Sequence, residues 1–122
     1  MTSLQCCPFC AIVRGEDVVV REVARNDKVV VFFPTEPAVL GHCMVIPRRH
    51  VEEFTALTSD EVSAVMTSAQ AVAMSLRETY HPDGINIIQS NGEAATQSVP
   101  HVHVHIVPRW DEDYFGNLWP TK

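Results

Sequence analysis

The sequence lacks any long run of apolar residues. Its longest stretches of this kind, such as the five residues 29–33, have the length of a β-strand, whereas a membrane-spanning helix needs about 20 predominantly apolar residues. The N-terminus also lacks a basic region followed by an apolar segment, which is the pattern of a secretory signal. We therefore expect no membrane partner and a cytoplasmic location.

Positive charge is scarce as well. The chain has 9 Lys and Arg against 15 Asp and Glu, for a formal net charge of −6. This balance argues against the broad electropositive surface that neutralises a nucleic-acid backbone. We expect no nucleic-acid partner, and a small phosphorylated ligand would have to be held by local contacts.

The sequence has no internal repeat, low-complexity tract or linker that would mark a domain boundary. A chain of 122 residues with 46% hydrophobic composition has enough apolar surface for one core and no room for a second. We therefore expect a single domain over residues 1–122.

One segment has the period of a helix and several have the character of strands. Thr58 and Glu61 form a capping-box pattern, and apolar residues recur every 3.6 positions from there, which predicts a helix from about Ser59 to Tyr80. The predicted strands cover residues 18–23, 28–33, 41–46, 84–89 and 101–108. The order is β-β-β-α-β-β, which predicts an α+β fold: an antiparallel β-meander of about five strands with one main helix on one face.

The cysteines cluster near the N-terminus. Three of the four, Cys6, Cys7 and Cys10, fall within five residues, and the fourth is Cys43. The Cys-x-x-Cys spacing of Cys7 and Cys10 suits half of a zinc site better than a disulfide framework. A thioredoxin-like redox pair lacks its βαβ context here, so no redox cofactor is expected, and a metal site and free thiols both remain open from the spacing alone.

Three histidines alternate with apolar residues near the C-terminus, as His101, His103 and His105. In a strand, alternate side chains share one face, so three imidazoles would line up at roughly 6.6 Å intervals with the apolar side chains on the opposite face. A plain solvent-facing strand would more often carry Thr, Lys, Glu or Arg at these positions. The cluster of titratable groups therefore indicates a functional site.

Two kinds of chemistry could use these imidazoles. A single metal ion bound by all three is geometrically poor, because the outer two lie about 13 Å apart along a flat strand and zinc–nitrogen bonds are about 2.0 Å long. The alternative is covalent catalysis, in which a neutral imidazole attacks phosphorus while its neighbours orient it and bind phosphoryl oxygens.

The pattern His-φ-His-φ-His-φ-φ over residues 101–107, with φ apolar, resembles the defining motif of the histidine triad (HIT) family. Three further motifs of that family occur in the same order, and they cover nearly the whole chain. They are the N-terminal Cys-x-x-Cys of the bacterial-type branch, the Gly-His-x-x-Val-Ile-Pro strand at residues 41–47, and the polar loop Asn-Gly-x-x-Ala-x-Gln-Ser-Val at residues 91–99.

The resemblance implies a HIT-like fold and a homodimer in which the main helix and a strand edge meet across a two-fold axis. It also implies a hydrolase or transferase that removes a nucleoside monophosphate from a phosphoramidate or a dinucleoside polyphosphate, acting on a purine nucleotide such as an AMP derivative. The covalent nucleotidyl intermediate would form on His103, held in the right tautomer by a backbone carbonyl. His105 and His42 would be donors near the phosphate.

The resemblance extends to binding residues. Asn91, Gln97 and Ser98 would bind phosphoryl oxygens or the departing group. Structural zinc would be held by two thiolates and two imidazoles, from Cys7, Cys10, His50 and His101.

The chain departs from the family at two positions. Thr96 stands where the family usually has Gly, and Pro34 stands near the usual ribose-binding acidic or amide residue. Two rival functions are a nucleotide-binding module with little turnover and a metal-dependent hydrolase with zinc at the triad; chelation separates the latter, because a catalytic metal is required for turnover.

Overall fold

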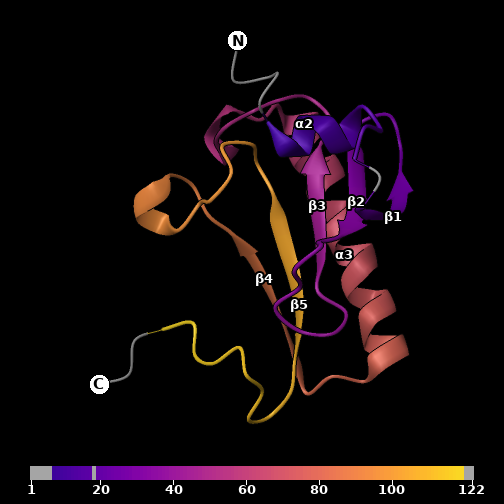
Figure 1. The fold of residues 1–122 in the computed structure, drawn as a ribbon, viewed down its shortest axis with the longest axis vertical. Helices are drawn as coiled ribbons and strands as arrows, with labels where there is room; N and C mark the ends of the chain where they lie inside the picture. The colour runs from indigo at the N-terminus through magenta and orange to yellow at the C-terminus, as the bar shows by residue number, and fades with distance from the viewer. Residues whose placement is uncertain (1–6, 18, 120–122) are drawn as a thin grey trace.

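The computed structural model describes residues 7–17 and 19–119, which form an antiparallel sheet with one long helix (Figure 1). In chain order the elements are α2 (Pro8–Val13), β1 (Arg21–Arg25), β2 (Val29–Phe33), β3 (Cys43–Pro47), the short 3₁₀ helix η1 (Phe54–Ala56), α3 (Ser59–Tyr80), β4 (Gly84–Gln89), a second 3₁₀ helix η2 (Glu93–Ala95) and β5 (Val104–Arg109). The predicted α+β class, five antiparallel strands and main helix are confirmed.

The sheet does not follow chain order throughout. Its strand order is β1-β2-β3-β5-β4, with every neighbouring pair antiparallel. A strict meander would place β4 beside β3. Instead the 22-residue α3 is long enough to carry the chain across the sheet, so β4 lies at the edge and β5 fits between β3 and β4. This arrangement places β5, the last strand of the chain, at an interior position of the sheet.

Helix α3 begins and ends where the sequence predicts. The Thr58 hydroxyl accepts from the Glu61 N–H at 3.1 Å, and the Glu61 carboxylate accepts from the Thr58 N–H at 2.9 Å, so both halves of the capping box are present. Glu61 also pairs with Arg49 at 2.7 Å, which ties the start of the helix to the segment after β3. Within the two described ranges, no helix combines the length and apolarity needed to cross a membrane.

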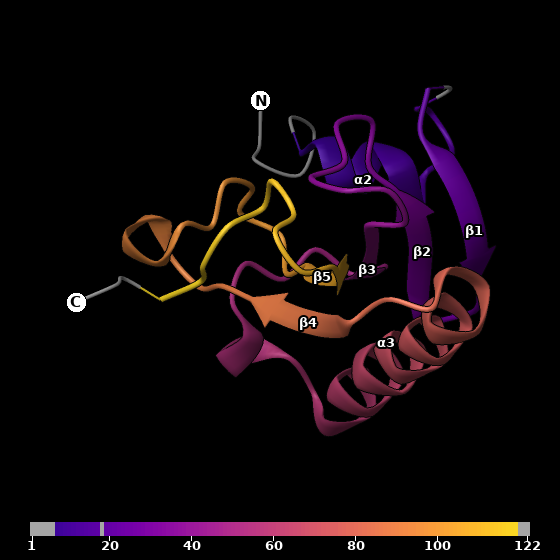
Figure 2. The ribbon, with the colours of Figure 1, turned by 90° about the horizontal axis from the view of Figure 1, so that it is seen from below.

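Strands β2 and β3 are buried on both faces. One set of their side chains, including Phe32 and Ile46, packs with α2, and the alternate set, including Val31 and Val45, packs with α3. Figure 2 shows the consequence: α2 and α3 lie on opposite faces of the sheet. The alternation along β5 therefore decides which of its side chains face α3 and which face the α2 side.

The structure differs from the sequence prediction at the first and last strands, and it contains one helix that was not predicted. The first strand runs from Arg21 to Arg25 rather than over 18–23, and residue 18 lies outside the described part of the chain. The last strand begins at Val104 rather than at residue 101, because the Val102 N–H donates to the Val51 carbonyl at 2.7 Å instead of joining the sheet. Helix α2 was not predicted, since its six residues are too few to establish a helical period.

Gly41 explains why the third strand begins late. Its φ is +86°, and a Cβ there would meet the Tyr80 ring at 3.1 Å and the Pro108 ring at 3.2 Å. The left-handed backbone turns the chain before β3, so the strand runs from Cys43 to Pro47. The same turn places His42 directly ahead of the strand.

Candidate functional site

The three predicted histidines keep their alternation although two of them precede the strand. Val104 and Ile106 belong to the core on the α3 side. His101 is fully buried, His103 is 3% exposed and His105 is half-buried. The imidazoles therefore do not form a solvent-exposed row. Phe9 of α2 covers two of them, with its ring centroid 5.9 Å from that of His101 and 5.1 Å from that of His103.

The tautomer of His103 follows from one contact. Its Nδ1 lies 2.9 Å from the carbonyl oxygen of His101, and a carbonyl oxygen can only accept. Nδ1 therefore carries the proton. The lone pair of the neutral ring is left on Nε2.

A second pair of histidines forms a relay of hydrogen bonds. The Ala38 N–H donates to His42 Nδ1 at 3.0 Å, so the proton of neutral His42 resides on Nε2. That Nε2–H donates to His105 Nδ1 at 2.8 Å. His105 consequently holds its own proton on Nε2, which makes this atom a hydrogen-bond donor.

Burial keeps these rings neutral. It lowers the pKa of His42 and His103 below the usual imidazole value, and lowers the pKa of His101 and His105 to about 4. Neutral imidazole is the form that acts as a nucleophile or binds a metal. All four side chains are therefore in a reactive form near pH 7.

His42, His103 and His105 line a common cleft of about 290 Å³, which we call the triad cleft. It is completed by one residue of the β2–β3 connection, by residues of β4, β5 and the loop between them, and by residues of the C-terminal segment. These are Ala38, Ile88, Ser90, Thr96, Val107, Phe115 and Leu118. The cleft thus joins a nucleophilic nitrogen, hydrogen-bond donors and an apolar wall.

The polar loop residues predicted from the sequence lie elsewhere. The Asn91 amide is bonded to the Phe54 N–H at 2.7 Å and to the Gln89 side chain, and the Gln97 amide joins the Gly92 N–H to the Glu52 carbonyl at 2.7 Å each. Ser98 is exposed. None of the three is among the residues that line the triad cleft.

A second group of side chains comes together around His101, the first histidine of the triad. Cys7 and Cys10 are at the start of α2, His50 follows β3, and His101 precedes β5. Their ligand atoms all lie within 4.8 Å of one another. We call these four residues the Cys/His cluster.

The Cys/His cluster fits a tetrahedral ion. Zinc bonds of about 2.3 Å to sulfur and about 2.0 Å to nitrogen place adjacent sulfur and nitrogen ligands about 3.5 Å apart. The observed separations are 3.4 Å from Cys7 Sγ to His101 Nδ1, 3.6 Å from Cys10 Sγ to His101 Nδ1, and 3.2 Å from Cys10 Sγ to His50 Nδ1. The His101 Nε2–H donates to the Pro47 carbonyl at 2.8 Å, which directs Nδ1 toward the sulfurs.

The burial and proximity of the Cys7 and Cys10 side chains also favour a bound cation. Burial and the adjacent Cys7 thiol raise the pKa of Cys10 to about 11. Two neighbouring buried thiolates need a positive charge between them, and a bound metal ion supplies it. Cys43 is a separate buried thiol on β3, and Cys6 lies outside the described residues.

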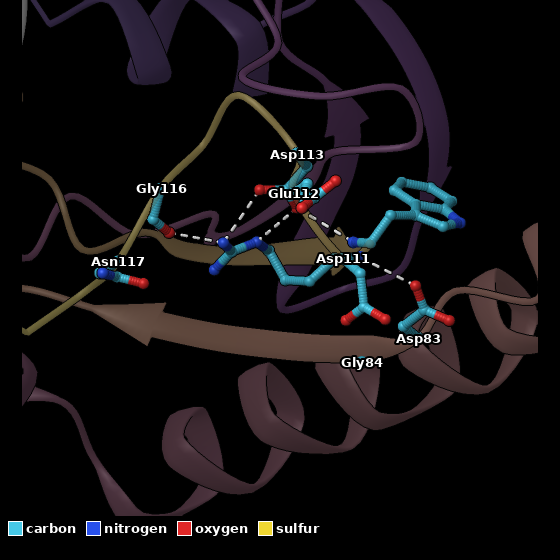
Figure 3. Close-up of a pocket in the computed structure, with 9 residues that line it drawn as sticks. Asp83, Gly84, Asp111, Glu112, Asp113, Gly116 and Asn117 are labelled. Atoms are coloured by element: carbon cyan, nitrogen blue, oxygen red, sulfur yellow. Dashed lines mark hydrogen bonds and ion pairs between the residues drawn. The ribbon is translucent and has the colours of Figure 1, made fainter.

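A wider hollow of about 450 Å³ lies at the C-terminal end of β5 (Figure 3). Its lining includes the carboxylates of Asp83, Asp111, Glu112 and Asp113, but no histidine or cysteine. Asp83 accepts from the Asp111 N–H at 2.8 Å, and Asp113 accepts from the Trp110 N–H at 3.0 Å. These groups hold the chain turn together, so the triad cleft remains the better candidate site.

Sequence reasoning missed several residues of the site. Phe9 stands between the two predicted zinc cysteines, and its aromatic character was the signal that it packs on nearby imidazoles. Ser90 directly precedes the polar loop and nothing in the sequence ranks it above its neighbours, whereas Thr96 was singled out only as a departure from the family's Gly and not as a cleft residue. Phe115 and Leu118 follow no periodic pattern, so their place in the cleft was visible only in the structure.

Comparisons with known proteins agree on one family. The model of the HIT domain matches residues 18–112. The chain is 34% identical to Protein hit of Bacillus subtilis, over 94% of this chain and 79% of that protein. It is 32% identical to an adenosine 5′-monophosphoramidase of Schizosaccharomyces pombe, over 94% of this chain and 84% of the relative. The crystal structure of a Zn-bound histidine triad family protein from Mycobacterium smegmatis has a TM-score of 0.83 and 33% identity, covering 94% of this chain and 82% of that one.

Proposed function

The chain belongs to the HIT domain family, and we propose that it is a nucleotidyl hydrolase or transferase working through a covalent intermediate on His103. The substrate we propose is a purine nucleotide derivative, an AMP phosphoramidate ahead of a dinucleoside polyphosphate. The name of the Schizosaccharomyces pombe relative, an adenosine 5′-monophosphoramidase, supports this order.

One observation carries the proposal. The His101 carbonyl holds the proton of His103 on Nδ1, which leaves the lone pair on Nε2 of a residue that lines the triad cleft. A binding module with little turnover has no need of a nucleophile fixed in this way. A separate observation argues against the metal-dependent alternative, since of the three triad histidines only His101 lies in the Cys/His cluster.

In the first step His103 Nε2 attacks the α-phosphorus, and the bond from phosphorus to the leaving group breaks. The amine departs with its electron pair and takes one proton from water in the open cleft. His103 keeps its Nδ1 proton and becomes a cationic nucleotidyl-imidazole, whose charge the His101 carbonyl oxygen stabilises. The Nε2–H of His105, oriented by His42, donates to a phosphoryl oxygen as negative charge develops there.

In the second step water or another acceptor attacks the same phosphorus on the opposite side from His103. The phosphorus–nitrogen bond breaks, the neutral imidazole is restored, and the proton of the attacking water is released. The sum is hydrolysis of one phosphoramidate to a nucleoside monophosphate and an amine, with one proton taken up and one returned.

The polar loop has two roles in this proposal. Ser98, which is exposed, supplies a hydroxyl to the phosphoryl oxygens or the departing group once substrate is bound. Asn91 and Gln97 act as positioning residues, because their amides hold the loop to the backbone beside η1.

We propose that the Cys/His cluster is a structural zinc site. The ion would be held by Cys7, Cys10, His50 and His101, and it would act as a cross-link between α2, the segment after β3 and the segment before β5. The fit of the sulfur and nitrogen separations supports zinc, as does the Zn-bound relative from Mycobacterium smegmatis. Thiolate ligands of this kind stay reduced in the cytoplasm, the compartment we propose.

We also propose a homodimer formed along β4 and the neighbouring side of α3. Both β1 and β4 are edge strands, but β1 carries Arg21, Glu22 and Arg25, whereas β4 has no charged residue. Charged edges discourage pairing with another strand. Ile87 on β4 is 48% exposed, and Met66 and Met74 on α3 are also exposed.

Two measurements test the covalent mechanism. Rapid mixing with an adenosine phosphoramidate, quenched without acid, should give one nucleotidyl adduct that maps to His103 by mass spectrometry. A substrate made chiral at phosphorus should give product with net retention of configuration, because two in-line displacements each invert it. Inversion would show that water attacks directly, and the nucleophilic role of His103 would then be wrong.

Variants separate the roles of the histidines. We expect His103→Ala to lose both turnover and adduct while still binding AMP. His105→Ala should slow adduct formation without abolishing it. His81→Asn is the matched control, since His81 is the one histidine outside the triad cleft and the Cys/His cluster, and it is exposed at the end of α3.

A further inference from the structure

The C-terminal segment, residues 110–119, folds back along the sheet after β5 (Figure 1). Two of its side chains, Phe115 and Leu118, line the triad cleft beside His103 and His105. The segment contains no helix or strand of its own. Its position must therefore be fixed by side-chain contacts.

One side chain at the end of β5 makes most of these contacts. The Arg109 guanidinium donates to both carboxylate oxygens of Asp113 at 2.8 and 3.0 Å and to the Gly116 carbonyl. Its central carbon lies 4.6 Å from the centroid of the Phe115 ring. The contacts to Asp113 and Gly116 are dashed in Figure 3.

The same guanidinium is anchored to the sheet. It donates to the Asn86 amide oxygen on β4 at 2.7 Å, so one residue of β4 and three of the C-terminal segment meet at one side chain. The ion pair is well shielded, with Arg109 21% and Asp113 9% exposed, and the guanidinium holds the pKa of Asp113 well below its usual range. These contacts require the planar guanidinium group of arginine, because the ammonium group of a lysine cannot donate two parallel hydrogen bonds to one carboxylate.

The wall that Arg109 supports is apolar. Phe115 and Leu118 stand with Ile88 and Val107 around the imidazoles, and the described residues that line the cleft include no Lys or Arg. A chain of phosphates would find no cation there. A carbon-rich group attached to the phosphorus would instead remove apolar surface from water.

We propose that Arg109 is a positioning residue that fastens the C-terminal segment to β4 and β5, so that Phe115 and Leu118 form a wall selecting substrates with an apolar leaving group. This rests on the proposed function, because the leaving group must lie beside His103. Arg109 itself touches no reacting atom. It acts through the two side chains it holds in place.

The first test does not depend on activity. Both tryptophans of the chain, Trp110 and Trp119, lie in the C-terminal segment, so tryptophan fluorescence, excited at a wavelength where tyrosine does not absorb, reports on this segment alone. Arg109→Lys should raise the rate of acrylamide quenching and the rate of proteolysis after residue 109. The matched control is Arg25→Lys, which removes an exposed guanidinium–carboxylate pair with Glu22 on β1 and should leave both unchanged.

The second test compares two substrates with the same nucleotidyl half. One is an adenosine phosphoramidate of an arylalkyl amine, and the other is the unsubstituted phosphoramidate. Arg109→Lys should raise KM for the arylalkyl substrate about tenfold with kcat nearly unchanged, the signature of losing a contact to one apolar group that is equally strong in the ground state and the transition state. Neither constant should change more than about twofold for the unsubstituted substrate. Phe115→Ala should reproduce this split.

The outcomes separate the two proposals. Unchanged quenching in Arg109→Lys, or an equal rise in KM for both substrates, would overturn the inference while leaving the covalent mechanism intact. If the parent protein turned over neither substrate, the proposed function would fail, and the selective wall would fail with it.

Discussion

The imidazole of His103 is tied to the main chain of His101, since its Nδ1–H donates to the His101 carbonyl oxygen at 2.9 Å. The side chain of the same His101 belongs to the Cys/His cluster, with Nδ1 3.4 Å from Cys7 Sγ. One residue therefore joins the proposed nucleophile to the proposed metal site. A change that loosens the Cys/His cluster should therefore also shift the His101 carbonyl, and with it the orientation of the His103 ring.

Replacing Cys10 by Ser should release the metal. Protein purified without added metal should contain about one zinc per chain, as expected of a four-ligand structural site. The variant should contain no zinc. Its main loss should be in stability, seen as a lower melting temperature, with a smaller loss of activity per folded molecule. Elemental analysis and thermal melts measure these changes. Cys43→Ala, which removes a buried thiol outside the cluster, should keep its zinc; a zinc-free parent protein would contradict the site.

Stability should fall as the pH is lowered from about 6.5 toward 4. Burial lowers the folded-state pKa of His105 to about 4 and also lowers that of His42, so the unfolded chain binds protons in this window that the folded chain does not. Each such group contributes at most about 1.4 kcal/mol per pH unit. Urea unfolding at several pH values measures the slope. His105→Phe should reduce it and the exposed control His81→Asn should not; an unchanged slope in His105→Phe would count against a buried neutral ring.

Thr96→Gly should stabilise the protein. Thr96 has a φ of +73° in the loop before the triad, and the left-handed region costs a residue with a Cβ about 1–2 kcal/mol. Part of that gain is offset by the greater chain entropy of unfolded Gly, leaving about 0.5–1 kcal/mol in the free energy of unfolding. Thr35→Gly, at an exposed residue without positive φ, should instead destabilise. Equal effects in the two variants would mean that the backbone at Thr96 carries no strain.

Ile87→Asp should split the proposed dimer. Across a two-fold axis along β4 it would bring two carboxylates together in an apolar contact, where repulsion and desolvation oppose association. Sedimentation at micromolar concentration should report a dimer for the parent and a monomer for the variant. Val23→Asp is the matched control, because Val23 is 51% exposed on the other edge strand, β1. A monomeric parent would refute the dimer and leave the chemistry of His103 untouched.

Local sequence was enough for the elements whose signals are local. The capping box at Thr58 and the apolar period after it fix α3, because the atoms that cap a helix lie within four residues of one another. Residues 84–89 form β4 with the predicted limits. The alternation around His103 likewise determines which side chains face the core, whether or not the backbone there is counted as a strand.

Contacts between distant parts of the chain were decided only by the tertiary structure. The sheet places β5 between β3 and β4, which brings His42 to His105 across 63 positions of sequence and Cys7 to His101 across 94. It also turns the amides of Asn91 and Gln97 toward the backbone and the unpatterned Phe115 toward the triad. A motif specifies which residue types are present and how they alternate, but hydrogen-bond partners depend on distances that only packing sets.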